Sequence, residues 1–211
     1  MLRRSRRTWF LAGAMAALAA PAAPAVPAAA QIAWDSPALV SPAAPSGFSV
    51  FIVNPEGGDL GALATFRHSA GAVGLGYRAA IADESGSGDL AFSAGIDVSG
   101  ILARGVEGSE IDLMWWSGGG LGVGDEAVVT IPLGMILGWT GSSDNVQLSP
   151  YGGGHVVLDI VSGPGDAFRL DGVLDLGLDL QLSSGWMIRV GFSLGDRESL
   201  ALGVRLPSGG G

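Results

Sequence analysis

Among the residues that could act as an acid, a base or a nucleophile, one pair lies on a segment with a β-type pattern. His155 and Asp159 share one face of such a segment, four residues apart, which is ~13 Å along an extended strand. That separation is too long for a direct hydrogen bond. Ser149 or Ser193 could complete a Ser–His–acid arrangement, but the spacing selects neither serine. We therefore expect no enzymatic activity.

A glycine-rich run, Gly118–Asp125, resembles two ligand-binding motifs and fits neither. A dinucleotide-binding loop is followed by a helix, whereas Val128–Trp139 alternates as a strand. Calcium-binding Gly/Asp repeats require several tandem copies, and the chain has one. The absence of Lys excludes a phosphate-binding P-loop, and the absence of Cys excludes disulfides, thiolate metal sites and a Cys nucleophile. We expect no cofactor and no metal.

The charge distribution argues against nucleic acid as a partner. The net charge is −9, and all 11 basic residues are Arg. Four of them lie among the first seven residues, which leaves seven against 20 acidic residues in the remainder. A phosphate-binding surface needs clustered cations to displace counterions, and the sequence after these seven residues has no such cluster.

The first 30 residues are typical of a secretory signal peptide. Arg3, Arg4, Arg6 and Arg7 precede an apolar stretch, Trp9–Ala20, that is too short to span a bilayer as a helix. Small residues at positions 28–30 provide a cleavage pattern. Both the general and the twin-arginine export routes remain open.

The rest of the chain divides into three parts. Residues 31–47 are rich in Pro and Ala without an apolar period, which predicts a flexible linker. Residues 48–207 form one β domain, and residues 208–211 are a glycine-rich tail.

Alternation of apolar and polar residues is the main structural signal after residue 47. It is clearest in Val173–Leu182, where Leu at every even position alternates with Asp, Gly and other residues. Consecutive strand side chains point to opposite faces, so one face is all Leu. Turn residues separate the other expected strands, which are Phe48–Val53, Gly61–His68, Ala72–Ile81, Leu90–Leu102, Ile111–Val123, Ala127–Thr140, Val156–Ile160, Trp186–Leu194 and Leu200–Leu206.

Two architectures place these faces in opposite ways. A secreted soluble β-sandwich with a ligand-binding role would bury the Leu face, whereas a membrane barrel would turn it outward to lipid. Polar faces made mainly of Gly, Ser and Ala, and strand lengths near the 9–11 residues that cross a bilayer, favour the barrel. Trp139 and Trp186 lie at ends of apolar faces that fall on the same side of an up-and-down sheet, as in an interfacial aromatic girdle.

The leader, the alternation and the tandem hairpins over about Phe48–Leu206 give the chain an architecture that resembles the small outer-membrane barrels of the OmpA/OmpX kind. The resemblance implies a closed antiparallel up-and-down transmembrane barrel of 8–10 strands, inserted by the barrel-assembly machinery. It also implies the outer-membrane bilayer as the main partner, with a structural role or a minor passage for small solutes. Pro132 and Pro150 lack an N–H donor, which predicts a bulge at each.

In such a barrel the polar faces would meet in the lumen. The Arg residues of these faces fall on the first and last strands and the Asp residues on the strands between, so closure would place a basic wall opposite an acidic wall. The interior is then either filled by Arg–Asp pairs or left as a polarised passage for small solutes. The expected lumen residues are Arg67, Arg78, Arg189, Arg205, Asp97, Asp112, Asp159, Asp175 and Asp179.

Overall fold

The computed structural model describes residues 32–43, 46–55, 60–70, 73–83, 90–106, 110–124, 126–162 and 167–207. The expected signal peptide (residues 1–30) and the glycine-rich tail (residues 208–211) lie outside the described residues. The elements are α1 (Ile32–Asp35), β1 (Gly47–Asn54), β2 (Gly61–Ala70), β3 (Val73–Asp83), β4 (Leu90–Ala103), β5 (Asp112–Val123), β6 (Ala127–Gly138), β7 (Gly141–Ser143), β8 (Val146–Ser162), β9 (Ala167–Leu182), β10 (Met187–Gly195) and β11 (Ser199–Arg205).

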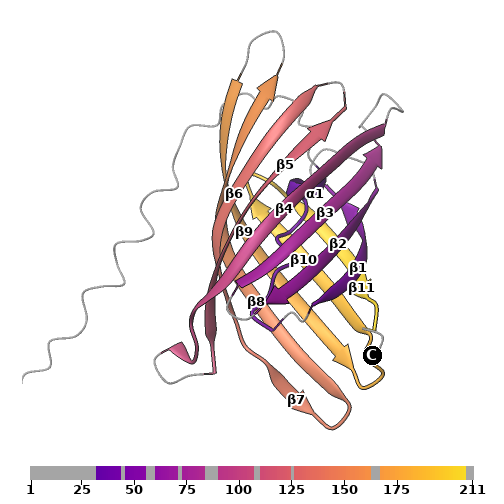
Figure 1. Ribbon diagram of the computed structural model, residues 1–211, viewed down its shortest axis with the longest axis vertical. Helices are drawn as coiled ribbons and strands as arrows, with labels where there is room; N and C mark the ends of the chain where they lie inside the picture. Colours follow the sequence, from indigo (N-terminus) through magenta and orange to yellow (C-terminus); the bar gives the residue numbers. More distant parts are fainter. Residues whose placement is uncertain are drawn as a thin grey trace, which may run out of the picture.

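Within the described residues, ten strands close into an antiparallel up-and-down barrel (Figure 1). Each strand pairs with its sequence neighbour, except that β6 pairs with β8, and β1 pairs with β11 to close the ring. The short β7 pairs with β8 beyond the end of β6. The predicted closed barrel is confirmed, and the alternative of two packed sheets is wrong.

The two faces of each strand meet opposite environments. Along β6, buried and partly or fully exposed residues alternate without interruption: Ile136 is 1% exposed, whereas Leu133 is 56% exposed. The leucine row of β9 also faces outward, with Leu174 and Leu176 about half exposed. Many inner positions are Gly, Ala or Ser, and they alternate with the outward apolar residues.

Neither proline causes the predicted bulge; both registers run through without a shift. At Pro132 the pairing with β5 is interrupted, and the hydroxyl of Ser117 donates to the Pro132 carbonyl at 2.9 Å. Pro150 lies opposite the break between β6 and β7, where its carbonyl accepts from the Trp139 N–H at 3.3 Å. Both prolines therefore lie where the ladder with one neighbouring strand is interrupted.

The predicted flexible linker is wrong for residues 32–42, which lie inside the barrel (Figure 1). The helix α1 contacts β2, β3, β4 and β5, and the chain continues without regular secondary structure through Ser41, with every residue from Ala33 to Ser41 buried. We call residues 32–42 the plug. Its apolar side chains fill the space that the inner glycines leave. No helix in the described part of the chain is long and apolar enough to cross a membrane.

Candidate functional site: the lumen and its plug

Trp34 of the plug lies in a pocket made by three inward-facing glycines. A Cβ atom at Gly118 would lie 2.6 Å from the Trp34 ring, one at Gly95 would lie 2.8 Å from it, and one at Gly120 would also collide with it. Trp116 stacks against Trp34, with ring centroids 6.1 Å apart and planes inclined by 16°. Because any larger residue would occupy the ring's place, these glycines are a structural requirement for the plug.

Two arginines of the barrel wall hold the plug by its backbone. The Arg78 guanidinium donates to the carbonyls of Ala33, Pro37 and Ala38, and its Cζ lies 4.8 Å from the Trp34 ring centroid. Arg189 donates to the Leu39 carbonyl at 2.9 Å. These contacts satisfy plug carbonyls that would otherwise be buried without a partner.

Side chains fix both ends of the plug. Ser93 Oγ accepts from the Ala33 N–H at 2.9 Å, and the Ser41 hydroxyl donates to Asp179 at 2.9 Å. Near the first of these contacts, Asp35 accepts from Arg197 at 2.6 Å. The plug is therefore bound along its whole length.

Arg197 is the centre of a buried charge cluster that joins the plug to β8 and β9. It lies in the turn between β10 and β11, is 1% exposed, and donates to Asp35, Asp159 and Asp171. Burial alone would lower its pKa, but the three carboxylates together outweigh burial and raise the pKa above its ordinary value. Thr130 also donates to Asp159, at 3.0 Å.

The candidate catalytic residues do not form a triad. His155 Nδ1 lies 2.8 Å from Asp175 Oδ2, out of line for a hydrogen bond, and Ser193 donates to the other oxygen of Asp175 at 2.7 Å. The carboxylate thus lies between the serine and the histidine, whereas a Ser–His–acid triad needs the histidine in the middle. Asp159 belongs to the Arg197 cluster, and Ser149 contacts Thr140 at 3.2 Å.

The predicted lumen charges are distributed as two walls that meet in ion pairs. The sheet order places the predicted Arg residues on β10, β11, β2 and β3, and the predicted Asp residues on β4, β5, β8 and β9. At one boundary Asp97 pairs with Arg78 at 3.4 Å and with Arg67. At the other, Arg189 and Asp179 form two hydrogen bonds, of 2.9 and 3.2 Å.

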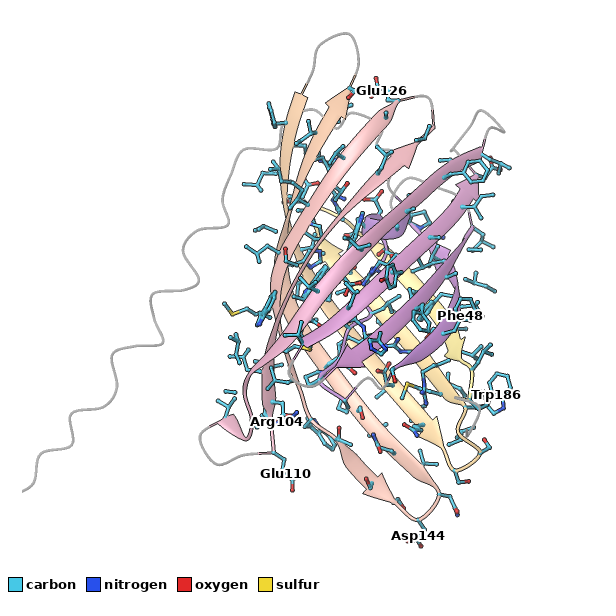
Figure 2. All side chains as sticks on the ribbon, viewed as in Figure 1. Phe48, Arg104, Glu110, Glu126, Asp144 and Trp186 are labelled. Carbon is cyan, nitrogen blue, oxygen red and sulfur yellow. The ribbon has the colours of Figure 1, made fainter. Side chains whose placement is uncertain are left out.

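Two predicted lumen residues lie instead at the mouth that is lower in Figure 1. Asp112 pairs with the exposed Arg104 at 3.1 Å and borders a cleft of about 420 Å³ (Figure 2 labels Arg104). Arg205 donates to the carbonyls of Ser46 and Gly185, at 3.2 and 3.3 Å. Neither takes part in the buried network around the plug.

The two predicted interfacial tryptophans are partly exposed and lie at this same end of the barrel. Trp139 follows the end of β6 and is 41% exposed; Trp186 precedes β10 and is 42% exposed. Figure 2 shows Trp186 near the lower rim, at the opposite end from Glu126.

Sequence reasoning missed the residues that form the plug's binding site. Trp34 and Asp35 fell in a segment that we expected to be a linker, and Arg197 fell in a turn signal. One signal was present: many inward-facing positions are Gly, and so leave space inside the barrel. No protein-family model matches the chain, and none of the curated proteins matches it.

Proposed function

We propose that the protein is an integral outer-membrane β-barrel whose lumen is closed by its own plug. Its role would be structural, or that of a minor solute passage that opens when the plug leaves. The N-terminal pattern of a secretory signal supports export, and insertion would use the barrel-assembly machinery.

The observation that carries the proposal is the apolar outer surface of the barrel. Large apolar side chains at least 38% exposed occur on every barrel strand in the described part of the chain and form a belt around the barrel. A water-soluble barrel would expose apolar patches of only a few hundred Å². One residue from each strand illustrates the belt: Ile52, Phe66, Tyr77, Ile96, Leu121, Leu133, Val156, Leu174, Phe192 and Leu202.

The filled lumen argues against an open pore. A void beside Leu39, Arg67 and Arg189 measures only about 10 Å³, which is at the lower limit for one water molecule. We therefore expect planar bilayers containing the intact protein to show no steady conductance.

Fractionation tests the membrane assignment. The full chain, expressed in a Gram-negative host, should remain with the outer membrane after alkaline and urea washes and should migrate differently on gels before and after heating. Recovery as a soluble, detergent-free protein would contradict the proposal and favour the secreted, soluble alternative.

A matched pair of variants tests which surface contacts lipid. Leu174→Arg at the middle of the β9 outer row should destabilise the barrel in lipid by about 2–4 kcal/mol, because the charge enters hydrocarbon. Leu182→Arg, at the end of the same row, should cost about 0–1 kcal/mol. Urea unfolding in lipid vesicles measures both. Equal and negligible effects would indicate that the row faces water.

A further inference from the structure

We propose that the barrel lumen is a peptide-binding site, occupied in cis by the plug, that accepts the same peptide from solution once the plug has been detached. The ligand class is a short peptide with an apolar aromatic residue followed by an acid, bound in the plug's conformation of one helical turn followed by an irregular segment. The inference is independent of the membrane assignment, because peptide binding can be measured in detergent micelles.

The wall recognises the plug largely through main-chain groups. Arg78 and Arg189 together bind four plug carbonyls, one at residue 33 and three at residues 37–39, and Ser93 accepts from a plug N–H. Leu39 adopts a φ of 51°, a strained conformation for a residue with a side chain, at the point where its carbonyl meets Arg189. Such strain persists only where the surrounding contacts determine the backbone.

Two side-chain subsites give the site its selectivity. The pocket of Gly95, Gly118 and Gly120 receives a flat aromatic ring, and Trp116 covers one face of it. The next residue, Asp35, reaches the Arg197 guanidinium. A buried aromatic ring beside a buried charge contact is the type of anchor that dominates binding energy at interfaces.

The plug can leave without making any of the arginines that hold it lose its carboxylate partner in the barrel wall. Each of the three arginines that hold it also has a carboxylate partner in the barrel: Arg78 has Asp97, Arg189 has Asp179, and Arg197 has Asp159 and Asp171. The strand ladders close without any plug residue, and the chain has no Cys to cross-link the plug. The plug therefore resembles a bound ligand more than a part of the barrel framework.

The experiment detaches the plug after the full chain has folded. A protease site is inserted between Ala43 and Ser46, the protein is folded in detergent micelles and cut, and a fluorescently labelled synthetic peptide of residues 31–42 is added in excess. We expect the labelled peptide to replace the native plug, measured by fluorescence anisotropy and by mass spectrometry of the released segment. Heat-dependent gel migration verifies that the cut barrel stays folded.

A matched peptide tests the recognition mechanism. The same peptide with Trp34→Ala should bind at least about tenfold more weakly, because it leaves the glycine pocket empty. Equal binding of the two peptides would overturn the proposal. So would a plug that never exchanges until the barrel itself unfolds, since the plug would then be an inseparable part of the fold.

An uncut variant gives a second test if the inserted site resists cleavage. Full-length Trp34→Ala should bind the labelled wild-type peptide, because its own plug is weakened, whereas the uncut wild-type protein should not. Absence of binding to a folded Trp34→Ala barrel would contradict the proposal. A failed membrane fractionation with successful peptide exchange would overturn only the proposed cellular role.

Discussion

Two ion-pair sites at opposite ends of the barrel contain the same groups in very different settings. In the lumen, Arg197 is 1% exposed and binds three carboxylates from the plug, β8 and β9. At the lower mouth, the Arg104 side chain is 73% exposed and binds one carboxylate, Asp112. The first site joins four segments of the chain, namely the β10–β11 turn, the plug, β8 and β9; the second joins two neighbouring ends of one hairpin.

The difference shows where a charge pair determines the structure. A buried carboxylate is costly without a partner, so Asp35, Asp159 and Asp171 constrain the position of Arg197 and, through it, the plug. The carboxylate of Asp112 can be hydrated in place of its contact with Arg104. We therefore expect the lumen cluster to control plug binding and the mouth pair to have little effect on it.

The largest effect should follow the removal of the central cation. Arg197→Met keeps a long side chain but leaves three carboxylates buried around an apolar group, which should cost about 3–5 kcal/mol. Urea unfolding in micelles, followed by tryptophan fluorescence, measures the loss. A change of less than about 1 kcal/mol would indicate that water replaces the guanidinium and that the cluster does not constrain the fold.

A smaller effect should follow the removal of the plug's own charge. Asp35→Ala leaves Arg197 paired with Asp159 and Asp171 and removes one charged hydrogen bond, worth about 1.5–3 kcal/mol. The loss should appear as faster proteolysis of the plug segment, with barrel unfolding changed less. If unfolding of the barrel strands changed by the same amount, the plug and barrel would be one cooperative unit.

Replacing the guanidinium by an amine should make the site sensitive to alkali. Arg197→Lys keeps the charge but loses the planar set of guanidinium N–H donors. We therefore expect the free energy of unfolding to fall by about 1–2 kcal/mol near neutral pH. The carboxylates would raise the pKa of the lysine above its ordinary ~10.4. A raised pKa stabilises the fold at lower pH, and that contribution is lost as the pH rises through the folded-state pKa.

The wild-type protein should show no such transition. The pKa of Arg197 is itself raised, so the charge persists to at least about pH 12. Tryptophan fluorescence during alkaline titration compares the two proteins. Identical profiles would show that the cluster does not depend on the charge at position 197.

The barrel could be predicted from the sequence because each strand shows its own alternation of apolar and polar residues. β6 begins at its predicted residue and ends two residues early, and β10 is shifted by one residue at each end. The prediction for β8 was poor: Val156–Ile160 was expected, but the strand spans Val146–Ser162. Pro150 and the three glycines at 152–154 interrupt the apolar pattern there, although pairing with β9 continues through them.

The plug could not be predicted in the same way because its structure depends on the barrel. Trp34 has no periodic neighbours, and its pocket consists of glycines from β4 and β5, some 60 to 85 residues away. Arg197 follows Gly195 and Asp196, which indicate a turn locally and say nothing about the acids of β8 and β9. The lumen side chains determine the conformation of such a segment, so its own local sequence does not predict that conformation.

The smallest effect should come from the mouth pair, and it is the control for the whole comparison. Arg104→Met removes the partner of Asp112, but the Gly105 N–H still donates to that carboxylate at 3.1 Å, and water can reach it. We expect a loss of less than about 1 kcal/mol in urea unfolding and no change in proteolysis of the plug. A loss as large as that of Arg197→Met would contradict the role assigned to burial. Faster proteolysis of the plug in Arg104→Met would contradict the assignment of plug binding to the lumen cluster.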